Sequence, residues 1–579
     1  MTGKSAPGVP AGTGCDEGET GPENATPPGN AIDFHGARFV APAGALTGLA
    51  LRVARLDQDP HRPRYHFQPR AGEFFQDTIP FFWKGVYHVF FQYAPDEWAG
   101  DKCVWGHVRS TDLIHWEELP VAITNGPEQY DRALCASGCV LSHEGKVHIF
   151  YGGVDGVTRE ETHCLATALD DDLIHWQKDA ANPIMRRAEL LPTDVYHLHG
   201  RWSDPDIWKE GDTWYMLLAA SLADQKTAAI PLYASSDLRN WSYVSCFYQA
   251  GAAPMRAMEY PHFFELEGRH VLFHHPWGMF TTFVEIGEHK EGHFVSQRRT
   301  HYDSARACAT KTLLDDQGRR IAWSWVLEDR PAGAESKPLD SPTRRAGWSG
   351  LMSLPRQLGV AADGALLMEP PAELEALRGD HTRLPSFALG TESPPDAPGT
   401  VNSQLLLDGV RGDCLEIVAR LRPQGASRFG LLVRCAPDLT EAARIGIDLE
   451  SGKLSFDNTH SSLESEVFRT VREVDLPMAE DGLVTLRVYV DRSVVEVFAN
   501  RNRACITGRT YPKRPDSLHV GLFSTGGRVR CEGIDIWEMT PIYASAEHGG
   551  SGQRGAASDR YEFPNITDEE REILGWPKS

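Results

Sequence analysis

A repeating unit constrains the fold of this 579-residue chain more than any other feature. One marker of the repeat is a turn that ends in tryptophan, and its central aspartates, Asp112, Asp172 and Asp237, lie 60 and 65 residues apart. A second marker is a glycine turn that leads into an aromatic, alternating strand. It occurs five times, at Gly85, Gly145, Gly211, Gly268 and Gly318. Five such markers predict five four-stranded blades around a central axis, the architecture of a β-propeller. We expect the three turn aspartates to bond the turn backbone and to be structural.

Three acidic residues stand in register with this repeat. Asp77, Asp204 and Glu259 precede the next marker glycine by 8, 7 and 9 residues, so each should begin the strand before the marker hairpin. If that strand is the innermost of its blade, the three carboxylates point into one mouth of the central channel. A lone acid in a β-rich chain is more often a turn cap or an ion-pair partner. Carboxylates that converge repel one another, so the cluster indicates a site of chemistry.

Charge and cysteine content narrow the classes of partner and compartment. The chain carries 58 basic and 80 acidic side chains, a net charge of −22, which argues against nucleic acid or an anionic membrane as partner and leaves a neutral ligand plausible. Eleven scattered cysteines fit neither a disulfide framework nor a zinc site. The first thirty residues do not resemble a signal peptide. We therefore expect a reduced, cytoplasmic protein.

Beyond the repeat, the pattern changes to longer alternating strands. Leu486–Val490 and Val494–Phe498, for example, flank a short turn and predict a hairpin. Many such strands after residue 380 predict a β-sandwich, so the whole fold should be all-β. The predicted parts are a disordered tail at 1–30, an N-terminal extension at 31–61 with a short helix near Ala41 to Leu56, the propeller at 62–360, a helical linker at 361–379, the sandwich at 380–543, and a flexible linker with an acidic tail at 544–579.

Several stretches carry a family resemblance. They are Tyr65-His-Phe-Gln-Pro69, Tyr87-His-Val-Phe-Phe-Gln-Tyr93, Trp105-Gly-His-Val-Arg-Ser-Thr-Asp-Leu-Ile-His-Trp116, Gly347-Trp-Ser-Gly-Leu-Met-Ser-Leu-Pro-Arg356 and Val490-Asp-Arg-Ser-Val-Val-Glu-Val-Phe498. From about Arg62 to Met539 the chain resembles glycoside hydrolase family 32, the invertase, inulinase and levanase group. That family has a five-bladed propeller followed by a β-sandwich.

The resemblance implies a role for each of the three acids. Asp77 matches the nucleophile, Asp204 the acid that stabilises the transition state, and Glu259 the general acid/base of a retaining glycosidase, a reaction that needs no metal or cofactor. The neighbours of these acids differ from the family motifs. Gln-Asp-Thr stands for Asn-Asp-Pro, Ser-Asp-Pro for Arg-Asp-Pro, and Glu-Tyr-Pro for Glu-Cys-Pro.

Four further residues are candidates for substrate contact. Gln92 matches a glutamine with which the family contacts substrate, although a strand-end hydrogen bond is as plausible. Trp105 could stack on a sugar or pack within its blade. Ser137 occupies the inner strand of the second blade, where a small residue could leave room for ligand or mark tight packing. Arg201 lies two residues before Ser203 and could replace the arginine of the family motif.

The resulting function hypothesis is a β-fructofuranosidase that releases terminal fructosyl residues from sucrose or short fructans. One alternative keeps the machinery but transfers the sugar to an acceptor or cleaves another furanoside. A second is a catalytically silent sugar-binding propeller. We expect a small carbohydrate as the partner and neither nucleic acid nor membrane, and a homodimer is left open.

Overall fold

The computed structural model describes residues 31–34, 37–40, 56, 58–70, 74–94, 103–197, 202–249, 257–276, 280–303, 306–331, 346–390, 402–500 and 503–543. The expected tails at 1–30 and 544–579 lie outside this part of the chain, as does the expected helix near residues 41–56 apart from Leu56. Within the expected N-terminal extension, β1 (Ala31–Phe34) and β2 (Ala37–Val40) pair as an antiparallel hairpin.

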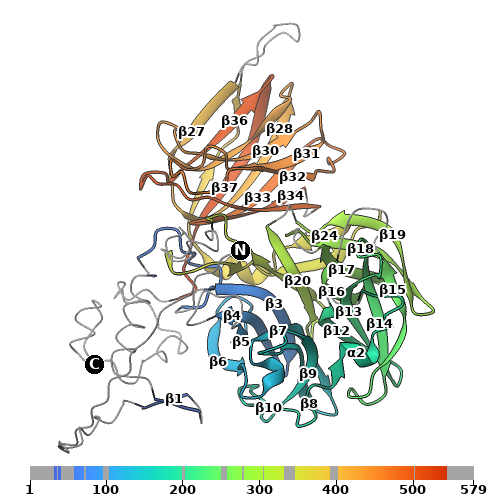
Figure 1. Cartoon of the computed structure of the whole chain (residues 1–579). Coiled ribbons are helices and arrows are strands. Elements are labelled where there is room, and N and C mark those ends of the chain that lie inside the picture. Colours follow the sequence, from blue (N-terminus) through green and yellow to red (C-terminus); the bar gives the residue numbers. More distant parts are fainter. Residues whose placement is uncertain are drawn as a thin grey trace, which may run out of the picture.

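Five antiparallel sheets follow one another along the chain and form the blades (Figure 1). Their strands are β3 (Phe74–Trp83), β4 (Val86–Ala94), β5 (Val104–Ser110) and β6 (Glu117–Ile123); β7 (Leu134–His143), β8 (Lys146–Val154), β9 (Glu161–Ala168) and β10 (Trp176–Lys178); β12 (Trp202–Glu210), β13 (Thr213–Ser221), β14 (Ala228–Ser235) and β15 (Ser242–Gln249); β16 (Met258–Leu266), β17 (Arg269–Pro276), β18 (Phe283–Lys290) and β19 (His293–His301); and β20 (Ala307–Leu314), β21 (Arg320–Val326), β23 (Arg356–Val360) and β24 (Leu366–Glu369). The short β11 (Met185–Arg186) pairs with β9, and β22 (Leu351–Met352) pairs with β21.

The first strand of each blade lies at the centre of the propeller. β3 contacts β7, β7 contacts β12, β12 contacts β16, β16 contacts β20, and β20 returns to β3. This closed ring confirms the predicted propeller and places the strands that carry Asp77, Asp204 and Glu259 around the central channel.

The glycine markers lie in the turns between the first and second strands, as predicted. Gly145 has φ 75° and the preceding Glu144 has φ 50°, so both central residues of this two-residue turn are left-handed. Such turns match the twist of the flanking strands and favour glycine. Each marker therefore sets the hairpin that positions an innermost strand.

The tryptophan turns are held by aspartate side chains, with one difference from expectation. In the first blade, Asp112 accepts hydrogen bonds from the backbone N–H groups of Ile114 and His115. In the third blade, Asp237 accepts the equivalent bonds. In the second blade, however, Asp170 accepts these bonds. Asp172 instead forms an ion pair with Arg109 at the surface. The turn is thus capped from a neighbouring position of the same motif.

The strands after residue 378 form the predicted sandwich. One sheet has the order β25 (Arg378–Leu384), β37 (Arg528–Met539), β28 (Cys414–Gln424), β33 (Val484–Asp491), β34 (Val494–Ala499) and β35 (Ala504–Arg509), with β26 (Phe387–Leu389) also paired to β37. The second has the order β27 (Asn402–Arg411), β36 (His519–Thr525), β29 (Arg428–Cys435), β30 (Ala443–Asp448), β31 (Lys453–Asp457) and β32 (Val471–Asp475). Their inner faces share one apolar core.

The boundary between the two parts lies later than the sequence suggested. β24 is the outer strand of the fifth blade, so the propeller continues past residue 360 to Glu369. Only a short 3-10 helix, η3 (Ala372–Leu377), separates it from the first sandwich strand. Within the expected helical linker at 361–379, residues 366–369 therefore belong to β24 and 378–379 to β25, and η3 is the helical part. The fourth strand was not predicted because the last repeat lacks a tryptophan turn to mark it.

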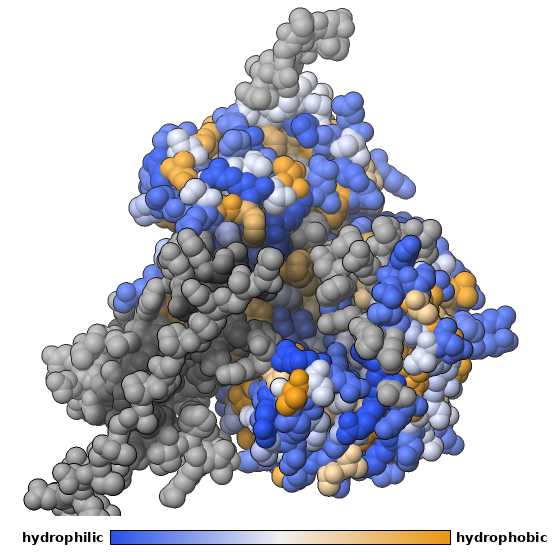
Figure 2. Space-filling model, viewed as in Figure 1, coloured by the Kyte–Doolittle hydropathy of each residue, from blue (hydrophilic) through white to orange (hydrophobic). Residues whose placement is uncertain are grey.

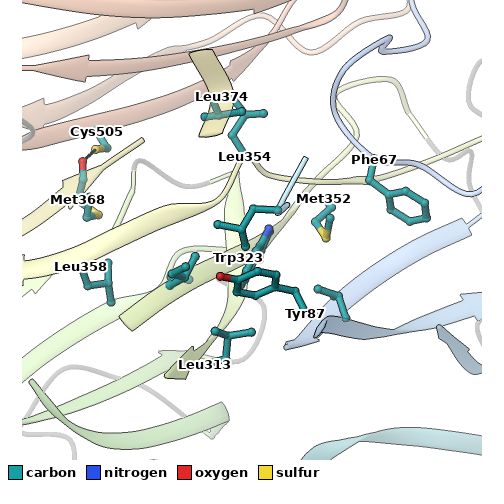
Figure 3. Packing of buried hydrophobic residues seen from close by; sticks show 14 of the residues in the cluster. Phe67, Tyr87, Leu313, Trp323, Met352, Leu354, Leu358, Met368, Leu374 and Cys505 are labelled. Carbon is teal, nitrogen blue, oxygen red and sulfur yellow. Dashed lines mark hydrogen bonds between the residues drawn. The ribbon is translucent and has the colours of Figure 1, made fainter. Parts of the chain in front are cut away.

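A continuous apolar core joins the propeller to the seven-stranded sheet (Figure 3). It contains Leu313, Trp323 and Leu358 from the fifth blade, Leu374 from η3, and Cys505 from β35. The seven-stranded sheet therefore lies between the propeller and the six-stranded sheet, and the six-stranded sheet has one face turned away from both.

Residues 64–68, which we call the strap, connect three parts of the molecule. The carboxylate of Asp491 on β33 accepts hydrogen bonds of 2.7–2.8 Å from the backbone N–H groups of Arg64, Tyr65 and His66. The other end of the strap meets the fifth blade, where Met352 N–H donates to Phe67 O at 3.0 Å. The strap directly precedes the first blade in the chain. It therefore links the first blade to the fifth blade and to the sandwich.

The surface of both parts is mostly hydrophilic, with apolar residues scattered over it (Figure 2). Within the residues that the structure describes, no helix has the length and apolar character needed to cross a membrane.

Candidate active site

The first strand of every blade departs from regular pairing near its start. The register against the second strand shifts between Gln76 and Thr78, Cys135 and Gly138, Ser203 and Asp206, Glu259 and His262, and Cys308 and Lys311. Bulges of this kind re-aim side chains and are over-represented next to active sites. Because they occupy the same place in successive blades, they surround one end of the central channel.

Two of the three acids lie within these bulges in a strained conformation. Asp77 has φ 49° and Asp204 has φ 57°. A left-handed backbone at a residue other than glycine costs on the order of 1–3 kcal/mol and persists where the surrounding structure enforces it, often at functional sites. The innermost strands therefore bend where two of the predicted catalytic carboxylates lie.

Glu259 stands one residue earlier in its strand. In the fourth blade the left-handed position belongs to Tyr260, with φ 55°, and Glu259 pairs with His275 of β17 as Gln76 pairs with Gln92 in the first blade. The three acids are therefore in the same part of the repeat but not at the same position. The longer glutamate side chain starts from one residue before the bulge.

Tyr260, which directly follows Glu259, links the strands of the three acids. Its N–H donates to Asp204 Oδ2 at 3.1 Å, and its hydroxyl donates at 2.7 Å to the carbonyl oxygen of Thr78, the residue after Asp77. Burial raises the pKa of Tyr260 well above its ordinary value, and the charges of Asp77 and Asp204 raise it further. Burial likewise raises the pKa of the Cys308 thiol, with further contributions from Asp77 and Glu259. The charge of Asp77 therefore affects Tyr260 together with that of Asp204, and affects Cys308 together with that of Glu259. Acids from the first, third and fourth blades converge on one region of the channel.

Each carboxylate has a specific hydrogen-bond environment. Ser137, buried in the first strand of the second blade, donates from Oγ to Asp77 Oδ2 at 2.6 Å. Asp204, only 5% exposed, accepts from Ser203 Oγ and from Tyr260 N–H, both at 3.1 Å. These bonds tie the second blade to the first and the fourth to the third.

Glu259 is the acid with a histidine neighbour. Its side chain is 18% exposed, and Oε2 lies 3.7 Å from Nδ1 of His275, whose side chain is 10% exposed. A carboxyl group in such a half-enclosed position retains access to a small ligand or water. That access is what a group exchanging protons with substrate needs.

A buried lysine forms the floor beneath the acids. Lys311 of the fifth blade donates to the carbonyl oxygens of Gly138 at 2.9 Å and Pro205 at 3.2 Å, and forms a 3.1 Å ion pair with Asp206. Its ammonium group also lies 5.1 Å from the centre of the Tyr260 ring. Gly138, Pro205 and Tyr260 each directly follow one of Ser137, Asp204 and Glu259.

The charge of the floor is compensated locally. Burial alone would raise the pKa of Asp206, but Lys311 and the adjacent His262 outweigh it and hold the pKa far below its ordinary range. His262 contacts Asp206 Oδ1 at 3.0 Å through Nδ1 and Thr312 Oγ1 at 2.8 Å through Nε2. Asp206 is therefore an ionised partner of Lys311 rather than a fourth free acid.

The secondary candidates have different outcomes. Gln92 is buried at the end of β4 and is hydrogen-bonded to Gln76, next to Asp77. Trp105 has no exposed surface, and its indole donates to Ala136 O at 2.9 Å, so of its two interpretations the structure favours packing over sugar stacking. Ser137 contacts Asp77 directly, as described above. Arg201 lies outside the described residues.

Sequence reasoning missed Tyr260, His275, Cys308 and Lys311. Tyr260 directly follows Glu259, and its hydroxyl donates to Thr78 O at 2.7 Å, so it links the strands of Glu259 and Asp77. Lys311 precedes its marker glycine by 7 residues, the same interval as Asp204. The interval is misleading, however, because the turn at Gly318 is longer. In the sheet Lys311 is the first residue paired after its bulge, the position that Asp206 has in the third blade.

Taken together, the site presents three carboxylates of unequal surroundings at one end of a channel. One accepts a short serine hydrogen bond, one is buried under two donors, and one is half-enclosed beside a histidine. Pairs of carboxyl groups in different environments can divide nucleophilic and acid/base roles, as glycosyl transfer requires.

Comparison with known proteins agrees with the fold. Residues 66–371 match the model for the glycosyl hydrolases family 32 N-terminal domain, and residues 373–538 match that for the family 32 C-terminal domain. Sucrose-6-phosphate hydrolase of Escherichia coli is 28% identical over 500 residues, which cover 82% of this chain and 94% of that protein. The β-fructofuranosidase insoluble isoenzyme 3 of Oryza sativa subsp. indica is 27% identical over 557 residues, which cover 84% and 92%.

Solved structures share the architecture. The crystal structure of fructan 1-exohydrolase IIa from Cichorium intybus superposes with a TM-score of 0.72 at 24% identity, covering 83% of this chain and 98% of that one. Sucrose-6-phosphate hydrolase from Lactobacillus gasseri gives a TM-score of 0.71 at 24% identity, covering 86% and 97%.

Proposed function

Because the chain belongs to glycosyl hydrolase family 32, we propose that it is a retaining β-fructofuranosidase acting on sucrose or short fructans. It is a glycosidase that cleaves β-fructofuranosides, in keeping with relatives named sucrose-6-phosphate hydrolase and β-fructofuranosidase. The observation that carries the proposed mechanism is the hydrogen-bonded link between the three strands that bear the acids: Tyr260, next to Glu259, donates to Asp204 and to the carbonyl oxygen of Thr78, next to Asp77.

In the first step, Asp77 attacks the anomeric carbon of the fructosyl unit while Glu259 donates a proton to the departing glycosidic oxygen. The bond to the leaving sugar breaks as the bond to the Asp77 oxygen forms. In the second step, Glu259 takes a proton from water, whose oxygen attacks the same carbon and releases Asp77 as a carboxylate. This double displacement retains the anomeric configuration.

Asp204 stabilises the positive charge that develops on the sugar and binds its hydroxyl groups. Its fixed position between Ser203 Oγ and Tyr260 N–H supports this role, because a preorganised charge needs no reorganisation during the reaction. Ser137 and Gln76 with Gln92 surround Asp77 and are placed to orient it and the bound sugar.

The residues beside the acids favour one alternative. Thr78, Ser203 and Tyr260 replace the neighbours typical of the family. All three are buried and change the surroundings of the acids from behind, without contacting solvent. The same machinery could therefore transfer the fructosyl group to a sugar acceptor or cleave another furanoside. A catalytically silent propeller is disfavoured by the retention of all three acids.

We place the reaction in a reducing compartment, on small imported sugars. The ten cysteines that the structure describes are all free thiols, nearly all of them buried, which suits such a compartment.

The test is turnover of sucrose, inulin, levan and arabinofuranosides, with products separated by chromatography. Asp77→Asn should reduce fructoside turnover to below about one ten-thousandth, because the amide cannot form the covalent intermediate. The matched control is Asp171→Asn at the surface, whose side chain is 70% exposed and which should leave turnover unchanged. Unaltered turnover in Asp77→Asn would rule the mechanism out, and fructo-oligosaccharide formed from sucrose alone would favour transfer.

A further inference from the structure

The outward face of the six-stranded sheet carries a groove that the proposed reaction does not use. The groove has a volume of about 440 Å³ and is lined by residues of β27, β36, β29, β30, β31 and β32. The alternate residues on these strands, such as Phe429, Leu431 and Ile445, point into the sandwich core. The groove therefore lies on the side of the sandwich that faces away from the propeller.

The floor of the groove is one row of residues that are paired across the sheet. The row runs in the order Gln404, Phe523, Gly430, Gly446, Ser455 and Glu473. Directly paired residues of antiparallel strands present their side chains on the same face. The two adjacent glycines therefore leave a gap in the side-chain layer in the middle of the sheet.

Phe523 extends into this gap. A Cβ atom placed on Gly446 would lie 3.5 Å from Cζ of Phe523, although Gly430 stands between the two residues in the row. The ring therefore lies along the sheet across Gly430 instead of standing up from it. Since Phe523 is only partly buried, it provides a flat apolar surface at the bottom of the groove.

Charged side chains of both signs form the two walls. On one side, Arg428 pairs with Asp448 at 2.8 Å, in the row that neighbours the floor. On the other side, Arg444 is paired across the sheet with Asp457. The Nε atom of Arg444 is buried and has no hydrogen-bond partner within the described part of the chain. A buried donor without a partner indicates room for an acceptor from a ligand.

We propose that this groove binds a neutral oligosaccharide chain laid across the strands. A flat aromatic ring stacks on the C–H face of a sugar, while arginine and carboxylate groups exchange hydrogen bonds with its hydroxyls. The mixed signs of the walls do not select an ion of either charge. The volume lies within the range of about 300–1,000 Å³ that is usual for small-ligand sites.

The choice of a fructan as the occupant rests on the proposed function. A chain held in the groove while its end is cleaved elsewhere would raise the local concentration of ends near the enzyme. We therefore expect the groove to affect the KM for long fructans and not that for sucrose.

Two substitutions test the groove in opposite ways. Phe523→Ala removes the stacking surface, and Gly446→Val fills the gap with a residue that strands favour, at a position whose backbone is not left-handed. The built Cβ atom meets Ser455 Oγ at 2.7 Å, the rotatable end of a short side chain. The control is Leu463→Ala, a more exposed apolar residue of the sandwich that lies outside the groove.

Calorimetric titration with an inulin-type oligosaccharide, in the Asp77→Asn background to prevent turnover, should show one bound chain fewer per protein in both groove variants than in the control. With Asp77 restored, the KM for long inulin should rise about fivefold in both variants, with sucrose turnover unchanged.

Equal binding stoichiometry in all proteins would overturn the proposal. So would a change in molar mass by light scattering on Phe523→Ala without loss of oligosaccharide binding, because it would identify a contact between two copies of the chain. Failure of the unaltered protein to cleave any fructoside would overturn the proposed function alone, because the binding difference does not depend on turnover.

Discussion

Ser137 forms a short hydrogen bond with the proposed nucleophile. Its hydroxyl donates to Asp77 Oδ2 at 2.6 Å from the neighbouring blade. Ser137→Ala should lower kcat on sucrose by about 10- to 100-fold, because an unanchored carboxylate spends less time aligned with the anomeric carbon. KM should change little, since the hydroxyl is held by Asp77.

The measurement is steady-state kinetics on sucrose, with Ser142→Ala as the control. Ser142 lies in the same strand but is exposed, and its loss should leave both constants unchanged. A rise in KM with constant kcat in Ser137→Ala would instead make the hydroxyl a direct ligand of the sugar.

At the scale of single residues, the repeat was enough to predict that Asp77, Asp204 and Glu259 lie near the start of innermost strands. It could not give the one-residue offset of Glu259, because the offset comes from the left-handed backbone at Tyr260. The sequence left open whether Trp105 stacks on a sugar or packs in its blade, because burial of an aromatic side chain depends on the packing of two blades, which a local pattern does not reveal.

The innermost strands are joined at their bulges by one charged group. Lys311 bonds carbonyl oxygens of the second and third blades and pairs with Asp206. Lys311→Met should reduce the free energy of unfolding by about 3–5 kcal/mol, because Asp206 would be left buried without its main counter-charge. The measurement is urea unfolding.

Two further proteins complete this experiment. Lys84→Met, which removes a half-exposed surface partner of Asp171, should cost at most about 1 kcal/mol. The double variant Lys311→Met with Asp206→Leu should recover part of the loss, since it removes both charges. If Lys311→Met alone unfolds like the surface control, the lysine does not hold the blades together.

At the scale of elements, the hairpins were predictable and the irregular pairings were not. A glycine in a tight turn is a local requirement, so it is visible in the sequence. A bulge depends on how a strand meets its neighbours around the channel, and its residues, such as Asp77 or Ala309, have no common composition. The fourth strand of the last blade was missed for a similar reason: β24 follows no tryptophan turn and is recognised only by its pairing with β23.

Three of the motifs that carried the family resemblance meet at the junction of the two parts. Glu496 of β34 accepts from Arg356 at 2.8 Å and contacts His66 of the strap at 3.2 Å. These motifs identified the family without revealing what they do. Their role is to join the propeller to the sandwich, which only long-range pairing shows.

This junction should make stability depend on pH in both directions. Burial alone would raise the pKa of Glu496, but Arg356 and His66 hold it at about 2, below the ordinary 4.5. The contribution of Glu496 to the free energy of unfolding is therefore complete above pH 4.5 and is lost as the pH falls toward 2. Burial would lower the pKa of His66, but the bonds to Asp491 and Glu496 raise it above 6.5. The contribution of His66 to the free energy of unfolding is complete below pH 6.5 and is lost as the pH rises through the pKa of His66 in the folded protein.

We expect the free energy of unfolding to be greatest between about pH 4.5 and 6.5 and to fall by about 2–3 kcal/mol for Glu496 on the acid side. Urea unfolding across this range is the measurement. Glu496→Gln should flatten the acid limb, whereas Glu450→Gln at an exposed turn should not. An acid limb that keeps its full slope in Glu496→Gln would assign it to other carboxylates.

The strap ties the sandwich to the first innermost strand, and this has a mechanical consequence. The propeller wheel has its seam where the first and fifth blades meet, and Asp491 grips the segment that crosses it. Local unfolding of the propeller should begin between the first and fifth blades. Weaker hydrogen bonding of the strap to Asp491 should therefore destabilise β3, the strand that carries Asp77, before the other innermost strands. Amide exchange that speeds up in β3 before the other inner strands when Asp491 is changed would make the second half of the chain the latch of the first.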